Sequence, residues 1–423
     1  MSSRTRWIPI WFLFTGGLIN YMDRSAISVA APLFMKDLSL DAAQLGIVFS
    51  SFFAGYALFA FIGGYSSDTL GPKRVLSLGM SVWSTFCALT AVAAGFTSLL
   101  VVRTIFGFGE GPFSSAANKM VGNWFPRRQI ATAIGLANAG TPIGGALAGP
   151  VAGWIGLRYG WRTSFLVLGC IGFLWTIFWI LVVKDRPEGY RSLSDSERPE
   201  SKADPCPIAL RESKLPLSFY LRQPTIIATG VSFFGYGYVL FFFLSWFPSY
   251  LTMARHMNIR DMGFVNTIPW ILGTIGLTIS GLACDFLSRI INDALRARKL
   301  VLVVCLFVAG ICVSLAGLVP GLASAVAFMA AAIFFVYLTG ATYWAIVQAT
   351  VPGEHIGAAS GFVHLIANCA GIIGPAVTGF IVRATGVFTS AFLLAGGVAL
   401  FGSLLVAILV RQSFQTPASE HQF

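Results

Sequence analysis

Ten stretches of the chain lack Asp, Glu, Lys and Arg, and most are long enough to cross a lipid bilayer. They are residues 7–22, 42–67, 75–102, 129–157, 163–183, 223–254, 262–284, 300–353, 355–382 and 384–410. A helix needs about 20 apolar residues to span a hydrocarbon core of about 30 Å. The stretch 300–353 therefore holds two spans, with a turn near Pro320, and 75–102 holds one span and the start of the next. We expect an all-α polytopic membrane protein with twelve transmembrane helices.

Composition supports a membrane protein over a soluble one. The chain is 56% hydrophobic and 11% charged, and its mean hydropathy is +0.77. A soluble fold could not cover so many long apolar helices with so few charges. The N-terminus, with Arg4 and Arg6 before an apolar run, also resembles a signal peptide. That run continues to about Phe34 and contains two charges, so we interpret it as the first span.

Basic residues indicate the orientation of the helices. With both termini in the cytoplasm, twenty lysines and arginines fall on the cytoplasmic side and six in the outer loops. This bias agrees with the positive-inside rule and explains the net charge of +11, so we expect a lipid bilayer and no nucleic acid as a partner. The seven cysteines have neither a paired nor a metal-ligand spacing, so we expect no metal and no cofactor.

A polar segment rich in Pro, Ser and both signs of charge divides the chain. We expect an N-terminal six-helix half at 1–184, a cytoplasmic linker at 185–222, a C-terminal six-helix half at 223–411 and a cytoplasmic tail at 412–423. Two motifs recur at matching spans of the halves: 64–74 is echoed by 281–289, and 145–153 by 371–379. Such internal repetition is typical of duplicated transporter folds.

The loop between the second and third spans carries the most specific motif. The pattern G-x-x-x-D-x-x-G-x-[KR]-[KR] is matched by Gly64, Asp68, Gly71, Lys73 and Arg74. The two glycines allow close helix approach and a tight turn, and the Asp can cap a helix or pair with a basic neighbour. An ordinary cytoplasmic turn is the alternative interpretation. The pattern resembles the signature of the major facilitator superfamily, which implies two pseudo-symmetric halves and a cytoplasmic latch formed by these residues in the outward-open state.

Gly149 and Pro150 form a second motif in the fifth span. Proline removes a helical hydrogen bond, and glycine lets a neighbouring helix pack closely. The superfamily resemblance implies that this kinked span lines the interface between the halves.

Four charged residues lie inside the predicted spans: Asp23, Arg24, Arg103 and Glu110. A charge at membrane depth costs roughly 2.5–3.5 kcal/mol on insertion scales. Asp23 and Arg24 point about 100° apart on a helix, so at least one needs a partner from another span. Arg103 and Glu110 are seven residues apart and lie on nearly one face. The four residues form either a structural ion-pair network or a transport site in which carboxylates carry protons and an arginine holds an anion.

Three stretches resemble the anion:cation symporter family, which includes bacterial hexuronate, galactonate and glucarate transporters. They are 20–25 (NYMDRS), 103–112 (RTIFGFGEGP) and 118–126, with its Asn-Lys and Trp-Phe-Pro. The resemblance implies that Arg24 contacts the substrate carboxylate and that Arg103 lies beside Glu110. It also implies that Asp23 and Glu110 take up and release protons. Tyr56 stands where family members have a substrate-facing Tyr or His.

The C-terminal half offers further candidates for the substrate cavity. Trp344 with Gln348, and His364 with Asn368, are spaced i, i+4, so each pair shares a helix face. Polar groups at membrane depth must be satisfied, and a polyhydroxylated ligand could satisfy them. Simple packing explains Trp344 equally well, and bonding between helices explains Gln348. Tyr236, together with Tyr238, adds candidate cavity aromatics on the seventh span.

Two positions depart from the family pattern. His364 stands where sugar-acid members carry Asn, and it either makes a second proton or carboxylate contact or is a core histidine. Thr141 stands where several members have Gln, which bears on which sugar acid is carried.

We therefore expect a proton-coupled symporter of a small organic anion, monomeric and located in the bacterial inner membrane. The preferred substrate is a sugar acid (a hexuronate, hexonate or aldarate), moved by alternating access. A same-family carrier of phthalate, hydroxyphenylacetate or tartrate is the alternative. An exporter of cations is disfavoured, because two arginines inside the membrane repel cations. We do not expect an enzyme, because the sequence shows no zinc-ligand spacing, nucleophile elbow or P-loop.

Overall fold

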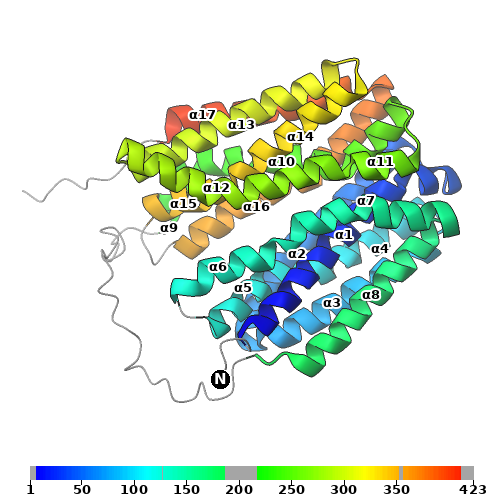
Figure 1. The fold of residues 1–423 in the computed structure, drawn as a ribbon, viewed down its shortest axis with the longest axis horizontal. Coiled ribbons are helices and arrows are strands. Elements are labelled where there is room, and N and C mark those ends of the chain that lie inside the picture. Colours follow the sequence, from blue (N-terminus) through cyan, green and yellow to red (C-terminus); the bar gives the residue numbers. More distant parts are fainter. Residues whose placement is uncertain (1–5, 126, 186–216, 352–355, 411–423) are drawn as a thin grey trace, which may run out of the picture.

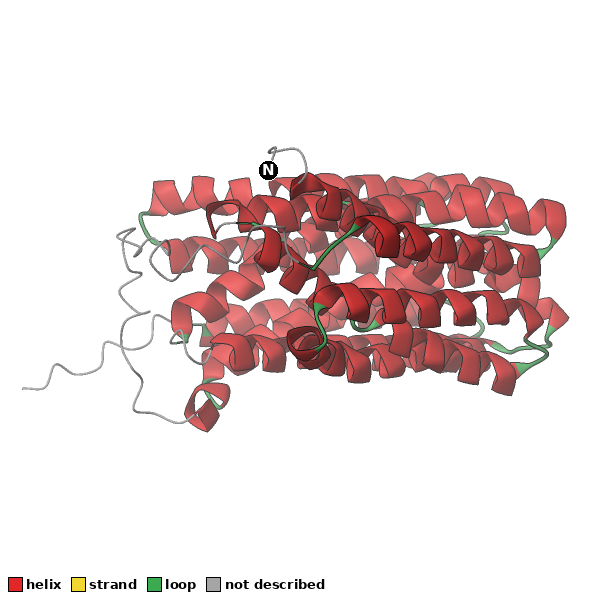
Figure 2. Ribbon diagram, turned by 90° about the horizontal axis from the view of Figure 1, so that it is seen from below, coloured by secondary structure: helices red, strands yellow, loops and turns green. Residues whose placement is uncertain are grey.

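The structure is a computed structural model that describes residues 6–125, 127–185, 217–351 and 356–410. Every regular element within these ranges is a helix (Figure 2). Of the expected linker, residues 186–216 lie outside the described ranges, and so does the expected tail, 412–423.

Eight helices form the N-terminal half. They are α1 (Ile8–Asp37), α2 (Ala42–Thr69), α3 (Pro72–Leu89), α4 (Phe96–Glu110), α5 (Phe113–Trp124), α6 (Arg127–Asn138), α7 (Gly140–Tyr159) and α8 (Trp161–Val182). Nine α-helices follow residue 216, and the first of them lies inside the expected linker. They are α9 (Leu217–Leu221), α10 (Pro224–Ser249), α11 (Ile259–Val265), α12 (Thr267–Ile291), α13 (Ala294–Leu318), α14 (Leu322–Leu338), α15 (Gly340–Thr350), α16 (Ile356–Thr385) and α17 (Thr389–Leu409).

Four of the predicted spans consist of two consecutive helices. The pairs are α4 with α5, α6 with α7, α11 with α12, and α14 with α15, each joined by one or two residues. With each pair counted once, and the short α9 left aside, the described helices give the twelve spans expected. The α4–α5 break falls at Gly111-Pro112, where proline has no backbone N–H for the helical ladder.

Nine stretches of the described helices are long and apolar enough to cross a membrane by length and composition. The three spans that fall short of this criterion are α1, α4–α5 and α6–α7. The first two contain all four intramembrane charges, and α7 is rich in glycine.

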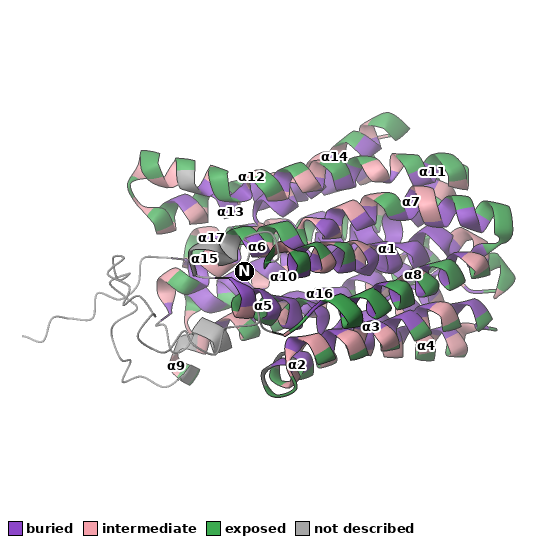
Figure 3. Cartoon of the chain, turned by 60° about the horizontal axis from the view of Figure 1, so that its bottom comes forward, coloured by how far each residue is buried: buried purple, intermediate pink, exposed green. Residues whose placement is uncertain are grey.

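The helices form two bundles that lie side by side (Figure 1). In the first, α1 packs on α7, α2 on α4, and α3 on α8; in the second, α10 packs on α16, α12 on α14, and α13 on α17. Large apolar side chains such as Leu181 and Phe286 are exposed on the outside, and buried residues face the interior (Figure 3). An apolar exterior of this extent is expected where a protein faces lipid.

The bundles meet along α2–α16, α7 with α11 and α12, and α1–α10. Arg383 Nη1 of α16 lies 3.6 Å from Asp41 Oδ2 at the start of α2, and Thr267 Oγ1 donates to Ala146 O across the halves at 3.0 Å. We call the end of the molecule at which α2 begins and α7 ends the closed end. At the opposite end, here called the terminal end, the ribbons of α5 and α6 diverge from those of α9 and α15 (Figure 1).

The described members of the loop motif make contacts within the first half. Gly71 joins α2 to α3 with a φ of 86°, a left-handed conformation that favours glycine. Lys73 N donates to Asp185 Oδ1 at 2.7 Å, and Lys73 Nζ donates to the carbonyl of Ile180 at 2.8 Å. Arg74 is exposed.

The side-chain positions of Gly64 and Asp68 lie outside the part of the chain that the structure describes. The expected latch therefore stays a prediction.

Candidate functional site

The four intramembrane charges form one buried cluster between α1 and α4. Asp23, Arg24, Arg103 and Glu110 are each at most 5% exposed. With all four ionised, the cluster carries two positive and two negative charges. Such groups are stable in a low dielectric only when they are paired or hydrogen-bonded.

Arg24 is the partner of Glu110. Its Nε donates to Glu110 Oε1 at 2.9 Å, and its Nη2 donates to the same oxygen. Arg103, the neighbour that the family resemblance implies for Glu110, lies close enough to it for electrostatic interaction. The hydrogen bonds to Glu110 come from Arg24 of α1, so Glu110 of α4 is the partner from another span that Asp23 or Arg24 was expected to need.

Aromatic rings surround the Arg24 guanidinium. Its Cζ lies 4.9, 5.0 and 4.8 Å from the ring centres of Tyr21, Phe52 and Tyr56. At these distances the electron-rich ring faces attract the cation. Tyr56 thus contacts Arg24, the arginine that the family resemblance assigns to the substrate carboxylate.

Arg103 shares the Phe52 ring with Arg24. Its Cζ lies 5.0 Å from the centre of Phe52 and 4.4 Å from that of Phe106. Both arginines line a small cavity of about 10 Å³, which is room for about one water molecule. Ser245 of α10 lines the same cavity, so the arginines face a space that both halves enclose.

Asp23 is held by a residue that sequence reasoning missed. Trp83 Nε1 of α3 donates to Asp23 Oδ2 at 2.7 Å, and Trp83 is 1% exposed. Nothing in the local sequence of α3 marks this tryptophan, because its role depends on a side-chain contact with a residue 60 positions away. Among the described residues, Asp23 Oδ1 and Glu110 Oε2 have no hydrogen-bond donor. Buried carboxylate oxygens without a donor can accept a proton or a water molecule.

A cluster of rings forms the facing part of the second half. Trp344 of α15 packs edge to face on His364 of α16, with ring centres 5.5 Å apart. Phe233 of α10 stacks on Tyr343 at 4.2 Å and contacts Tyr236 at 5.3 Å. The structure thus brings together the predicted Tyr236, Trp344 and His364. It adds Phe233, whose i, i+3 spacing from Tyr236 could have indicated a shared helix face.

Tyr21 lies where the two groups meet. Its ring packs edge to face on Trp270 of α12, with centres 5.9 Å apart, and its hydroxyl is close enough to Tyr236 and Tyr337 for electrostatic interaction. The same ring supports Arg24. The charge cluster and the ring cluster are therefore neighbouring parts of one central region.

The other predicted residues lie around this region. Asn368 is buried and its amide donates to the backbone carbonyl of His364 at 2.9 Å, and Gln348 is exposed. Thr141 is half-buried beside Gly17 of α1 and donates to Asn138 O at 2.8 Å. Tyr238 is buried against α16, next to Thr378.

Gly149 lies at the interface between the halves, where the superfamily resemblance implied that its span would be. A Cβ atom placed on Gly149 would lie 3.0 Å from the Cα atom of Gly263 on α11. A metal site is absent from the described residues, in which no group of three or more His, Cys, Asp or Glu could hold an ion.

Comparison with known proteins identifies a matching family and similar transporters. The family described as Major Facilitator Superfamily matches residues 13–363. The hexuronate transporter of Bacillus subtilis (strain 168) is 48% identical over 420 residues, which cover 99% of this chain and 98% of that protein. The D-galactonate transporter of Escherichia coli O6:H1 is 28% identical over 420 residues, 96% of each.

Solved structures share the fold. The nucleoside transporter NupG superposes with a TM-score of 0.73 at 14% identity, covering 95% of this chain and 100% of that one. A bacterial homologue of the human lysosomal transporter Spinster, in an inward-facing and occupied conformation, gives a TM-score of 0.72 at 20% identity, covering 97% and 96%.

Proposed function

Because the chain belongs to the major facilitator superfamily, we propose that it carries a sugar acid, most closely a hexuronate, across the bacterial inner membrane together with protons. The observation that carries this proposal is the ion pair of Arg24 and Glu110 beside a cavity enclosed by both halves. The identity of 48% with a hexuronate transporter over nearly the whole chain supports the substrate class.

Arg24 binds the carboxylate of the substrate in this proposal. Its guanidinium already donates two N–H groups to the carboxylate of Glu110. A substrate carboxylate offers the same acceptor geometry, so the two carboxylates compete for one guanidinium. Protonation of Glu110 removes its charge and weakens its hold on Arg24. Proton uptake thereby frees the guanidinium for the substrate, so that substrate binding is coupled to proton uptake.

Asp23 and Arg103 are the other two charged residues of the proposed site. Asp23 keeps one oxygen without a donor among the described residues, and it serves as the second proton acceptor. Arg103 faces the same cavity as Arg24 and keeps the potential there attractive to an anion. Cations are repelled for the same reason.

The ring cluster of the second half receives the body of the substrate. Tyr236, Trp344 and His364 each combine an apolar ring with a polar edge. Sugar acids likewise present C–H groups on one face and hydroxyls at the rim. Rings that bind the C–H face and polar edges that bind hydroxyls would fix the sugar while Arg24 holds its carboxylate.

With both termini in the cytoplasm, as the basic residues predict, the closed end faces the periplasm. The described arrangement then belongs to the stage at which substrate and protons leave inward, and a single chain contains the whole site. Rocking of one bundle against the other completes the cycle.

Uptake into proteoliposomes tests the proposal. Glucuronate and galacturonate are offered with and without an imposed pH gradient, acidic outside, and phthalate and tartrate serve as comparison acids. We expect the hexuronates to accumulate above equilibrium only with the gradient, and a protonophore to abolish the accumulation. Uptake of phthalate without uptake of either hexuronate would overturn the substrate class, and accumulation indifferent to the gradient would overturn the coupling.

A further inference from the structure

Tyr337 of α14 has a buried hydroxyl group that the mechanism above does not use. The side chain is 5% exposed, and among the described residues its hydroxyl has no hydrogen-bond partner. The ring packs closely over Gly273 of α12, where a Cβ atom would lie 2.8 Å from Tyr337 Cδ2. The ring is therefore held in place while its polar end is left unpaired. Buried hydroxyl groups are normally hydrogen-bonded, so an unpaired one indicates a site for a polar molecule.

Two other tyrosines lie beside this hydroxyl group. Tyr21 of α1 and Tyr236 of α10 are both close enough to Tyr337 for electrostatic interaction. The hydroxyl groups of Tyr21 and Tyr337 approach each other without the geometry of a hydrogen bond. We call Tyr21, Tyr236 and Tyr337 the tyrosine group. It combines one residue of the N-terminal half with two of the C-terminal half, and each phenol can both donate and accept a hydrogen bond.

One face of α12 supports a tyrosine from each half. The Tyr21 ring packs edge to face on Trp270, and the Tyr337 ring packs on Gly273, three residues later. Residues spaced i, i+3 are neighbours on a helix surface. The absence of a side chain at Gly273 leaves room for the Tyr337 ring next to the Trp270 ring. The packing of α12 thus brings the two tyrosines together.

The tyrosine group borders the proposed carboxylate site. Arg24 follows Tyr21 by three residues on α1, and its Cζ lies 4.9 Å from the centre of the Tyr21 ring. Tyr337 is also close enough to Arg24 for electrostatic interaction. A sugar whose carboxylate is bound to Arg24 would therefore have the atoms next to that carboxylate beside the three phenols.

In the ring form of a hexuronate, the hydroxyl group nearest to the carboxylate is the one on C4. The carboxylate is attached to C5, whose other neighbours are the ring oxygen and C4. Glucuronate and galacturonate differ only in the orientation of the C4 hydroxyl group. A site built to hydrogen-bond a substrate hydroxyl rejects an analogue that lacks it, because the polar groups of the site are then left unpaired.

We propose that Tyr337, together with Tyr21 and Tyr236, binds the C4 hydroxyl group of the hexuronate and makes the carrier selective for it. This inference rests on the proposed function, in which Arg24 holds the carboxylate of the sugar. Substrate binding then gives the Tyr337 hydroxyl the partner that the described protein groups do not provide. Because Arg24 belongs to the N-terminal half and Tyr337 to the C-terminal half, a sugar bound to both joins the halves.

Competition between sugars in proteoliposomes tests the contact. The full chain takes up labelled hexuronate in the presence of the unlabelled parent sugar, its 2-deoxy analogue, or the 4-deoxy analogue, which glucuronate and galacturonate share. For the wild type, we expect the 4-deoxy analogue to compete at least tenfold more weakly than the parent sugar. Tyr337→Phe removes only the hydroxyl group, so the 4-deoxy analogue should then compete within twofold of the parent sugar or better. The penalty for the 2-deoxy analogue should be the same in both proteins.

The outcomes separate this inference from the proposed function. If the wild type takes up hexuronate but Tyr337→Phe keeps the full penalty for the 4-deoxy analogue, the inference is overturned and the proposed function stands. Loss of the 2-deoxy penalty in place of the 4-deoxy penalty would also overturn it, because Tyr337 would then bind the opposite side of the sugar ring. A wild type that takes up no hexuronate would overturn the proposed function, and the inference with it.

Thermal unfolding of the substrate-free protein in detergent distinguishes a substrate contact from a structural role. Tyr337→Phe should unfold at the wild-type temperature or above, because its hydroxyl has no partner to lose among the described residues. The matched control is Tyr250→Phe. Tyr250 is 3% exposed, and its hydroxyl accepts from Arg255 Nε at 2.7 Å and donates to Ala316 O at 3.3 Å. Tyr250→Phe should therefore lower the unfolding temperature and keep the wild-type penalty for the 4-deoxy analogue. An equal drop in Tyr337→Phe, or loss of that penalty in Tyr250→Phe, would overturn the proposal.

Discussion

Arg24 donates to Glu110 with the same N–H groups that a substrate carboxylate would use. Side chains from α1 and α2 pack around the guanidinium, with Tyr21, Phe52 and Tyr56 each about 5 Å away. The rings therefore hold the cation in place. In the proposed cycle the arginine keeps its charge, and Glu110, which takes up a proton, gives way to the substrate carboxylate.

Glu110→Gln should keep substrate binding and lose proton coupling. The amide cannot take up a proton, so we expect uphill, proton-driven uptake to fall at least tenfold while exchange of substrate across the membrane continues. Both are measured in proteoliposomes with labelled hexuronate. Asp37→Asn makes the same acid-to-amide change at an exposed residue whose partners, Trp161 and Arg162, lie in the same half, and it should leave uptake within twofold. Wild-type accumulation in Glu110→Gln would remove this residue from the coupling role.

Arg24→Lys should be nearly as harmful as Arg24→Ala. An ammonium group is a compact charge that cannot stack flat on rings or donate two parallel N–H groups to a carboxylate. Breaking one side of a buried pair costs about 3–5 kcal/mol, so we expect uptake to fall by 100-fold or more in both variants. The exposed Arg162→Lys is the control. Transport at the wild-type rate in Arg24→Lys would contradict carboxylate binding by this residue.

Trp83→Phe should lower the thermal stability more than Trp161→Phe, which removes a similar hydrogen bond near the surface. It leaves the buried Asp23 without its donor, at a cost of about 1–3 kcal/mol. Trp161 also donates to a carboxylate, Asp37 Oδ2 at 2.8 Å, but that side chain is 50% exposed and can bind water instead. Thermal unfolding in detergent should therefore show a larger drop for Trp83→Phe than for Trp161→Phe. Equal drops would mean that the bond to Asp23 adds nothing beyond packing.

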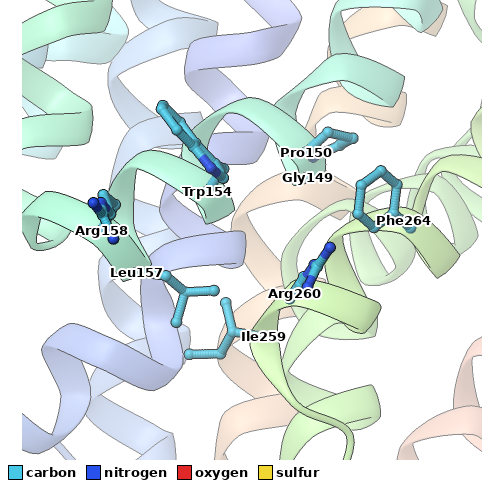
Figure 4. A pocket seen from close by; sticks show the side chains of 8 residues that line it. All are labelled: Gly149, Pro150, Trp154, Leu157, Arg158, Ile259, Arg260 and Phe264. Atoms are coloured by element: carbon cyan, nitrogen blue, oxygen red, sulfur yellow. The ribbon is translucent and has the colours of Figure 1, made fainter.

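At the level of the helices, α7 brings the two halves into close backbone contact where Gly149 faces α11 (Figure 4). Gly149 meets the backbone of Gly263, and Gly145 packs on the ring of Trp270. Glycine at these positions lets the helix axes approach more closely than any side chain would allow. Pro150 follows at once, so this span combines a close contact with a missing helical hydrogen bond.

Gly149→Ala should weaken the closed end. The added methyl group would lie 3.0 Å from Gly263 Cα, so the helices must separate. On the same helix, a methyl group at Gly153 has its nearest neighbour at an ordinary 3.6 Å. We expect spin labels on the loops of the closed end to report longer distances in Gly149→Ala and unchanged distances in Gly153→Ala. Identical distance distributions in the two variants would contradict a separation of the helices by the added methyl group.

For the whole molecule, the contacts between the halves lie between the central site and the closed end. Gly46 packs on Gly379, Phe53 packs on Gly371, and Asp41 pairs with Arg383. At the terminal end α5 and α6 diverge from α9 and α15, and Gln348 of α15 is exposed. If the halves are apart at the terminal end, the central site should be accessible from there.

Cysteine labelling from the terminal end tests this access. Gln348→Cys should react with a membrane-impermeant thiol reagent in vesicles that expose that end, above the level of the unmodified chain. Ser50→Cys, at a position only 7% exposed in α2, should not react. Saturating hexuronate should slow the reaction at Gln348→Cys. Labelling of Ser50→Cys at the rate of Gln348→Cys would contradict a closed end.

The sequence predicts correctly the features that a local pattern of residues determines, namely the helix spans and the family. The charge-free stretches were sufficient to predict the twelve spans, and the motif at 64–74 was sufficient to predict the superfamily, which is confirmed. Pairings across helices could not be predicted in this way. Arg24 with Glu110, and Trp83 with Asp23, join residues 86 and 60 positions apart, and only the tertiary arrangement of the helices selects them. Periodicity shows which face a residue occupies but not which neighbour that face meets.

The balance of two arginines and two carboxylates in the central cluster determines how the transport cycle depends on the membrane potential. With all four ionised, the empty carrier has no net charge in its membrane core, so its return step is indifferent to the membrane potential. Each net charge carried across 100 mV corresponds to about 2.3 kcal/mol. Any current during uptake must then come from the protons in excess of the single negative charge of a hexuronate. The charge recorded per substrate molecule would therefore count the protons directly: none for one proton, and one positive charge for two.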